Sequence, residues 1–162
     1  MPLLTNVKPI CTNGQWIRRR TGCYFRTEQG GELPMTRVLS LIDDDASVRR
    51  ATDRLIRSMG FTVEVFASGE EFLRFGSLQD TWCLVLDVYM PGMSGLELQS
   101  HLAAAGYRIP IIFVTACPDE WTRARALQAG AVDFLEKPFG EEALLNGIRS
   151  AQKLSEEDGQ PG

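Results

Sequence analysis

Short apolar runs alternate with helical patterns five times along the chain, from Arg37 onward. The runs that we expect to be strands span residues 38–42, 62–66, 83–86, 111–115 and 132–135. Four of them are almost uninterrupted apolar stretches, which is typical of strands buried on both faces of a sheet. Strands that alternate with helices in this way predict an α/β domain built on a parallel sheet.

Five helices are predicted between and after these strands. The fifth spans residues 141–154 and carries its apolar residues on one face. Four of the helices are preceded by residues suited to a helix start, and glycines that can adopt a left-handed conformation follow two of them. The predicted starts are Asp45, Ser68 with Glu71 as a capping box, Ser94, and either Pro118 or Asp119, and the glycines are Gly60 and Gly130.

Two segments lie outside this pattern. Residues 1–36 show no sustained period, so we expect an irregular N-terminal extension ahead of a domain that spans residues 37–153. Met35 stands directly before the first strand, and the sequence leaves open whether the native chain starts there. Residues 154–162 are polar and contain glycine, which predicts a tail or linker with no room for a further domain.

Length and composition agree with one folded domain plus tails. The chain has 162 residues, 44% of them hydrophobic, and a net charge of -4 that gives no sign of a nucleic-acid surface. The sequence contains no apolar run long enough for a membrane span and no apolar segment of a secretory signal. We therefore expect a cytoplasmic protein that does not act at a membrane.

Metal chemistry based on cysteine or histidine is not favoured. The four cysteines form no C-x-x-C pair, and His101 is the only histidine. A zinc site lacks both the ligands and the spacing that it needs. We expect the thiols to be reduced and mostly structural.

Charged and hydroxyl residues follow four of the five predicted strands. The first strand is followed by Asp43, Asp44 and Asp45, the third by Asp87, and the fourth ends in Thr115, while Lys137 follows the fifth. Ligands of open parallel sheets bind beyond the carboxyl ends of the strands, so these residues are expected to converge. Each has an ordinary explanation when taken alone, and for Asp45 the role of helix cap is favoured over that of a ligand.

A cluster of carboxylates favours a bound cation. Two carboxylates about 5 Å apart repel each other by roughly 3 kcal/mol at an effective dielectric constant near 20. Hard oxygen ligands with room for water favour Mg²⁺. Aspartate can attack phosphorus to give an acyl phosphate, and Lys137 and Thr115 could then pair with the phosphoryl oxygens.

The segments around these residues resemble the four signature blocks of response-regulator receiver domains of two-component systems. The blocks occur in the family's order, and the resemblance covers residues 37–153. They are LSLIDDDASVRR, CLVLDVYMPGMSGLEL, IIFVTA and AGAVDFLEKPF. The resemblance implies a flavodoxin-like (βα)5 fold, a doubly wound parallel sheet with strand order 2-1-3-4-5.

The resemblance also implies a metal site and a phosphoacceptor. Asp43 and Asp44 match the family's acidic pair, with Asp44 as the direct Mg²⁺ ligand. Asp87 matches the phosphoacceptor and second ligand, and the backbone carbonyl of Tyr89 is implied as the third ligand. The chain would thus be a signalling protein that catalyses only its own phosphorylation and dephosphorylation.

The remaining signature positions match residues that respond to phosphorylation. Thr115 resembles the switch hydroxyl and Lys137 the lysine that pairs with the phosphoryl group. Phe134 stands where the family has an aromatic switch residue that turns inward when Thr115 moves. Pro138 matches the proline that follows a cis peptide bond.

The implied partner is a sensor histidine kinase or a phosphotransfer protein. Phosphorylation would switch the conformation and control a homodimer or an output partner, in transcriptional regulation. The block GAVDFLEKPF most resembles receivers that precede a LuxR-type helix-turn-helix domain, which is absent from this sequence, so DNA would be contacted only through such a domain. The sequence leaves open whether the receiver stands alone or is part of a longer regulator.

The sequence leaves three alternative functions to compare with this one. A haloacid-dehalogenase-type phosphatase also phosphorylates an aspartate, but it needs an acidic residue where Tyr89 stands. A nucleotide- or flavin-binding module needs a glycine-rich phosphate loop, which the sequence lacks. A metal-free scaffold that acts only through protein contacts is the third, and an Asp87→Asn variant without phenotype would favour it.

Overall fold

The computed structural model describes residues 15–19, 22–26, 32–34, 37–76 and 78–157. Contacts divide the chain into two compact units, Met1–Thr36 and Arg37–Gly162. The boundary between the units coincides with the expected start of the α/β domain.

The N-terminal unit contains a small antiparallel sheet. Strands β1 (Gln15–Arg19), β2 (Gly22–Arg26) and β3 (Glu32–Pro34) lie in that order, with Trp16 opposite Phe25 in the register. The expectation of an irregular extension is therefore wrong for these residues. Their aromatic and β-branched residues favour strands, but each run is too short to produce a sustained period in the sequence.

The second unit is built on a five-stranded parallel sheet. Its strands are β4 (Val38–Ile42), β5 (Val63–Phe66), β6 (Thr81–Asp87), β7 (Ile111–Thr115) and β8 (Asp133–Glu136). They are ordered β5-β4-β6-β7-β8, and every neighbouring pair is parallel. Counted within this unit, the order is 2-1-3-4-5, which confirms the predicted fold class. Strand β6 begins two residues earlier than expected and includes Asp87.

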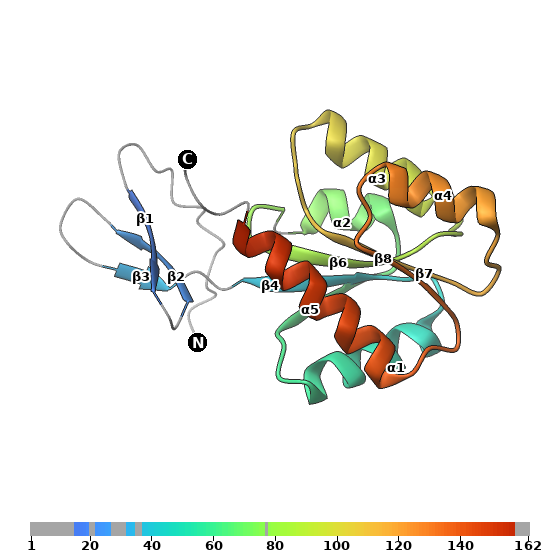
Figure 1. Ribbon diagram of the computed structural model, residues 1–162, viewed down its shortest axis with the longest axis horizontal. Helices are drawn as coiled ribbons and strands as arrows, with labels where there is room; N and C mark the ends of the chain where they lie inside the picture. Colours follow the sequence, from blue (N-terminus) through green and yellow to red (C-terminus); the bar gives the residue numbers. More distant parts are fainter. Residues whose placement is uncertain (1–14, 20–21, 27–31, 35–36, 77, 158–162) are drawn as a thin grey trace. The chain divides into compact units, whose positions relative to one another are not determined.

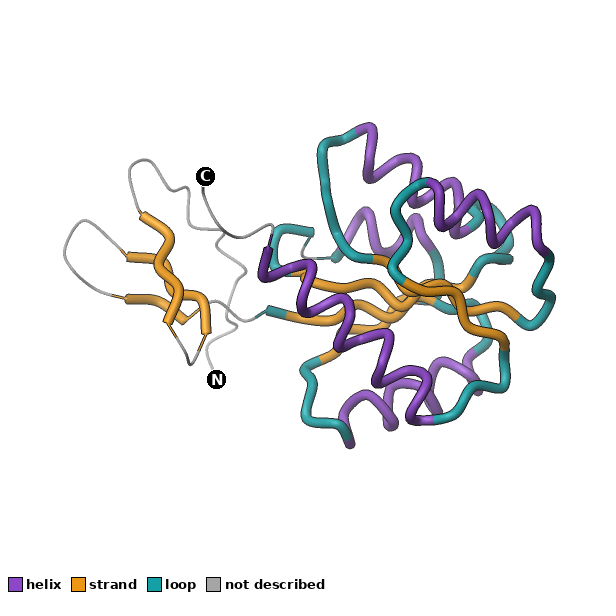
Figure 2. Tube along the Cα trace, viewed as in Figure 1, coloured by secondary structure: helices purple, strands orange, loops and turns teal. Residues whose placement is uncertain are grey.

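Helices cover both faces of this sheet (Figure 1). One face packs against α1 (Ala46–Ser58) and α5 (Glu141–Glu157), and the other against α2 (Gly69–Phe75), α3 (Gly95–Ala104) and α4 (Glu120–Gln128). Figure 2 shows these helices in layers on either side of the strands. Alternate residues of each strand therefore join two separate cores. In β6, for example, Leu84 and Leu86 join one core, and Cys83 and Val85 join the other.

Side-chain caps fix where the helices begin beside the carboxyl edge of the sheet. Asp45 accepts hydrogen bonds from the backbone of Ser47 (2.8 Å) and Val48 (3.1 Å), so its predicted role as a cap is confirmed. Ser94 and Glu97 form a complete capping box at α3. At α2, Ser68 caps the helix, but the Glu71 carboxylate accepts from the backbone N–H of Ala67, so the box is only half formed.

Helix α5 is longer than expected. The predicted tail over 154–162 is wrong for its first residues, because α5 continues to Glu157. Within residues 154–162, glycine and proline occur only after Glu157, at Gly159, Pro161 and Gly162, so the polar residues before them are compatible with helix. Among the described helices, none has both the length and the hydropathy to cross a membrane.

Candidate functional site

The parallel register brings the predicted site residues to one edge of the sheet. Ile42 of β4 pairs with Leu86 of β6, so Asp43 and Asp87 each directly follow a member of this pair. Asp87 in turn pairs with Val114, which directly precedes Thr115. Three carboxylates, those of Asp43, Asp44 and Asp87, offer oxygen atoms that all lie within 4.8 Å of one another.

Lys137 lies beside this carboxylate cluster. Its Nζ is 2.6 Å from Oδ2 of Asp43 and 3.3 Å from Oδ2 of Asp87. Its backbone N–H donates to the Thr115 carbonyl at 2.8 Å, which ties the end of β8 to the end of β7. The peptide bond between Lys137 and Pro138 is cis, as the family resemblance implies. Of the residues expected at the strand ends, the structure therefore brings Asp43, Asp44, Asp87 and Lys137 together.

Gly95 lets the first turn of α3 pack against the end of β6. Its backbone N–H donates to the Val88 carbonyl at 2.8 Å. A Cβ atom at this position would lie 2.3 Å from the Asp87 carbonyl oxygen and 3.0 Å from the Phe113 ring. No side chain fits there, so glycine is required for the helix to approach the strand that carries Asp87.

Burial and like charges perturb the acidity of the site. Burial, and after it the charge of Asp43, raise the pKa of Asp87 to about 6. Burial acts to lower the pKa of Lys137, but the hydrogen bond to Asp43 and the charges of both aspartates outweigh it and raise that pKa. Lys137 is therefore a cation at neutral pH, while Asp87 carries its charge at a cost to the folded state.

This cost predicts a pH dependence of stability without metal. Because the folded-state pKa of Asp87 lies above its usual value of 3.8, its contribution to stability is complete below about pH 4 and is lost as the pH rises through about 6. Between these values the melting temperature of the metal-free wild type should fall relative to that of an Asp87→Asn variant. Calorimetry of both proteins across this range measures the difference. Parallel profiles would contradict the raised pKa.

The residues present fit a hard divalent cation. Three carboxylates face a single lysine, so the cluster retains an excess of negative charge. Both oxygens of Asp43 are already engaged, Oδ1 by the backbone N–H of Asp45 at 2.9 Å and Oδ2 by Lys137. Asp44 is exposed beside them and is the more accessible of the acidic pair.

The two predicted switch residues lie on neighbouring strands. Thr115 is fully buried, and its Oγ1 accepts a hydrogen bond from the backbone N–H of Cys117 at 3.1 Å. Phe134 is 4% exposed and packs 6.3 Å from the Phe113 ring, with the Arg123 guanidinium 5.9 Å from its own ring. In this structure the Phe134 side chain therefore occupies the inward position.

Tyr89 makes a contact that the sequence did not predict. Its hydroxyl donates to Oδ2 of Asp119 at 2.7 Å and lies 3.3 Å from Oγ1 of Thr122. A second unpredicted contact joins Glu70 of α2 to the same loop, where its carboxylate accepts from the backbone N–H of Met93 at 2.8 Å. Both contacts join residues more than 20 positions apart, and no local pattern in the sequence signals such pairs.

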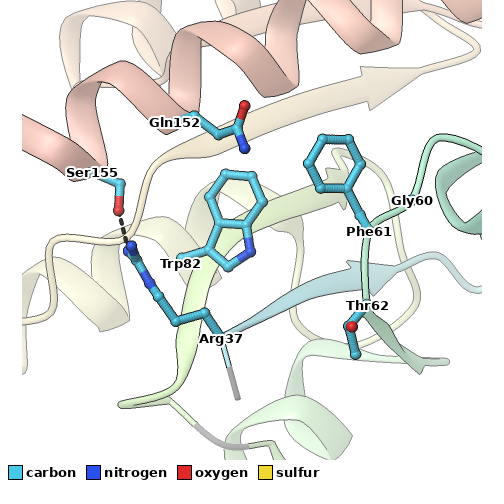
Figure 3. Close-up of a pocket in the computed structure, with 7 residues that line it drawn as sticks. All are labelled: Arg37, Gly60, Phe61, Thr62, Trp82, Gln152 and Ser155. Carbon is cyan, nitrogen blue, oxygen red and sulfur yellow. Dashed lines mark hydrogen bonds between the residues drawn. The ribbon is translucent and has the colours of Figure 1, made fainter. Parts of the chain in front are cut away.

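A shallow pocket lies at the opposite, amino edge of the sheet (Figure 3). Trp82 and Phe61 pack with 5.9 Å between their ring centroids and their planes tilted by 45°. Arg37 donates to the Ser155 hydroxyl in the last turns of α5. Arg37 thereby ties the start of β4 to the end of α5, where a cation also complements the helix dipole. This pocket is separate from the carboxylate cluster, which lies at the carboxyl ends of the strands.

Comparisons with known proteins agree with this geometry. A family model described as "Response regulator receiver domain" matches residues 39–149. "Response regulator protein TodT" of Pseudomonas putida is 47% identical over 118 residues, which cover 73% of this chain and 52% of that protein. "Transcriptional regulatory protein FixJ" of Azorhizobium caulinodans is 39% identical over 127 residues, which cover 78% and 60% of the two chains.

Solved structures show the same likeness. The structure titled "Low Resolution Structure of Response Regulator StyR" shares 46% identity and has a TM-score of 0.70, with 75% of this chain and 61% of that chain covered. The chain spans about half the length of the curated relatives it matches. The likeness therefore concerns the unit that carries the carboxylate cluster.

Proposed function

The chain belongs to the response-regulator receiver family, and on this basis we propose that it accepts a phosphoryl group on Asp87 and switches conformation as a result. The observation that carries the proposal is the convergence of three carboxylates and Lys137 at the carboxyl edge of the sheet. The same edge holds a buried hydroxyl, that of Thr115. This set of groups can hold a cation, supply a nucleophile and neutralise a transferred anion.

In the proposed reaction, a carboxylate oxygen of Asp87 attacks the phosphorus of a partner's phosphohistidine. The new O–P bond gives an acyl phosphate, and the P–N bond breaks with its electron pair returning to the imidazole. Lys137, now 3.3 Å from Asp87, pairs with a phosphoryl oxygen, and Thr115 donates a hydrogen bond to another. Mg²⁺ held by Asp44, Asp87 and the Tyr89 carbonyl would neutralise charge on the transferred group.

A substitution at Asp44 tests the proposed metal site. Asp44→Asn should weaken apparent Mg²⁺ affinity by about tenfold or more, because it removes a charged and accessible ligand. The midpoint of the Mg²⁺-dependent rise in melting temperature measures this affinity. Asp45→Asn is the matched control, because it removes the neighbouring charge and asparagine still caps α1. An equal loss of affinity in both variants would count against Asp44 as a ligand.

The proposed switch follows from the charge that phosphorylation adds. An acyl phosphate carries a charge of about -1.5 to -2 where the free Asp87 carboxylate carries about -1, so it adds negative charge to an edge that already has an excess. Thr115 would move toward this charge, and β7 and Phe134 would adjust because they pack against one another. The surface of α4, β8 and α5 would then present a different shape to partners.

The proposed phosphoryl donor is a sensor histidine kinase or a phosphotransfer protein in the cytoplasm. The proposed partner for the surface altered by phosphorylation is a second copy of the chain. Phosphorylation should therefore shift the chain from monomer to dimer. Light scattering coupled to chromatography, with and without beryllofluoride and Mg²⁺, measures the mass. Identical masses in both states would contradict the dimer and leave the acceptor site unaffected.

An output role in transcription is proposed for a regulator in which this receiver is joined to an output domain. "Transcriptional regulatory protein" is part of the names of FixJ and TdiR, which this chain resembles over its receiver. The resemblance of the last signature block to receivers that precede a LuxR-type domain supports the same role. DNA binding would then belong to an output domain, and the receiver would control it by its phosphorylation state.

A further inference from the structure

Tyr89 lies in the loop after Asp87, and its side chain contacts the start of helix α4. Tyr89 stands two positions after Asp87, and its backbone belongs to the edge that carries the carboxylate cluster. Its side chain is 51% exposed and extends to the first turn of α4, where the hydroxyl meets Asp119 at 2.7 Å and Thr122 at 3.3 Å. A single residue therefore bridges the acceptor loop and a helix more than 20 residues later in the chain.

The two carboxylate oxygens of Asp119 accept hydrogen bonds from different elements, one from α4 and one from the loop after β6. Oδ1 caps α4 by accepting from the backbone N–H of Thr122 at 2.8 Å, while Oδ2 accepts from the Tyr89 hydroxyl. The Thr122 hydroxyl and backbone N–H, followed by the Tyr89 hydroxyl, hold the pKa of Asp119 below its usual value. The carboxylate is therefore ionised at neutral pH, which strengthens the hydrogen bond from Tyr89.

This bond is independent of the route through the switch residues. Thr115, at the end of β7, is connected to α4 through the backbone of the loop that contains Cys117 and leads to Glu120. The Tyr89 side chain instead crosses directly from the β6–α3 loop to the helix cap. A displacement of the acceptor loop would thus pull on the first turn of α4 without involving β7 or Phe134.

We propose that the Tyr89–Asp119 hydrogen bond is a second link between the acceptor site and α4, with Tyr89 as a positioning residue. This inference rests on the proposed phosphoacceptor function of Asp87. When the site is occupied, the loop shifts and Tyr89 transmits the shift to the cap of α4. Without the bond, the site still fills, but α4 responds less.

Trp121 provides a natural reporter of this response. It is the second residue of α4, it is 64% exposed, and its ring stacks on the Arg125 guanidinium at 4.8 Å. Trp82 lies at the opposite edge of the sheet and serves as an internal reference. Fluorine NMR of the full chain labelled with 5-fluorotryptophan gives one signal for each of its three tryptophans, and single Trp→Phe variants assign the signals of Trp121, Trp82 and Trp16.

The decisive variant is Asp119→Ser. Serine is a good helix cap, so α4 keeps its start, but the oxygen that accepts from Tyr89 is lost. Beryllofluoride with Mg²⁺ is the probe, and its own fluorine signal reports how much adduct has formed. We expect a full adduct in wild type and in Asp119→Ser, with the shift of Trp121 reduced at least twofold in the variant. Tyr89→Phe should reduce the shift similarly when compared at equal adduct.

The outcomes separate the two proposals. An unchanged Trp121 shift in both variants, with full adduct, overturns the link and leaves the phosphoacceptor function standing. Failure of the wild type to form an adduct overturns the phosphoacceptor function, and the link with it. Tyr107→Phe removes a tyrosine hydroxyl outside this contact, so a reduced Trp121 shift there would also overturn the link, because the effect would not be specific to Tyr89.

Discussion

Asp87→Asn should abolish uptake of a phosphoryl group from acetyl phosphate or from a phosphorylated kinase, while the protein stays folded. The amide lacks the charged oxygen that attacks phosphorus, and no other carboxylate at the site can replace it. Asp43 has both oxygens engaged, and Asp44 lies on a different strand end. Electrophoresis that retards phosphorylated protein measures the uptake, and the expected loss is complete.

The same variant should be more stable than the wild type in the absence of metal. Asparagine removes a charge that burial and Asp43 destabilise, and the gain at neutral pH should be about 1–2 kcal/mol after allowance for solvent screening. Asp53→Asn is the control, because Asp53 pairs with Arg57 on the surface of α1. Residual phosphorylation of Asp87→Asn at the wild-type level would show that another residue is the acceptor.

Lys137→Met should destabilise the metal-free protein by about 2–3 kcal/mol at neutral pH. Among the described residues, Lys137 is the only cation that pairs with the side-chain carboxylates of Asp43 and Asp87, and its side chain is 14% exposed. Its removal leaves buried carboxylates facing one another without compensation. Near pH 5 the difference from wild type should shrink, because Asp87, whose pKa burial raises to about 6, then takes up a proton. Chemical denaturation at the two pH values measures both effects.

Two controls make this prediction specific. Lys153→Met removes an exposed lysine of α5, far along the chain from the cluster, and should change stability little. Added Mg²⁺ should recover part of the loss in Lys137→Met, because a bound cation replaces the missing charge. Equal destabilisation at both pH values, with no effect of Mg²⁺, would mean that Lys137 contributes through packing and not through charge.

The sheet and its site were predictable because both depend on local patterns. Apolar runs such as 111–115 are strands buried on both faces, and their spacing by helices dictates a parallel sheet. Once the sheet is parallel, the carboxyl ends lie on one edge, so Asp43, Asp87 and Lys137 must converge. In the structure, the Lys137 Nζ lies within hydrogen-bonding or ion-pair distance of both Asp43 and Asp87.

Other features could not be found in the same way. The strands β1 and β2 are five residues each, and their pairing depends on contacts between separate short runs. The Tyr89–Asp119 hydrogen bond joins positions 30 residues apart, and neither residue belongs to a local pattern that names the other. The length of α5 was underestimated because polar residues in its last turn resemble a linker, although they are also compatible with helix.

The most direct test of the account is the intact mass of the wild-type protein after incubation with acetyl phosphate, with and without Mg²⁺, followed by borohydride reduction and peptide mapping. Reduction of an aspartyl phosphate marks the modified residue. We expect the added mass of one phosphoryl group only when Mg²⁺ is present, with the mark on Asp87. No added mass with Mg²⁺, or a mark on a different residue, would contradict it.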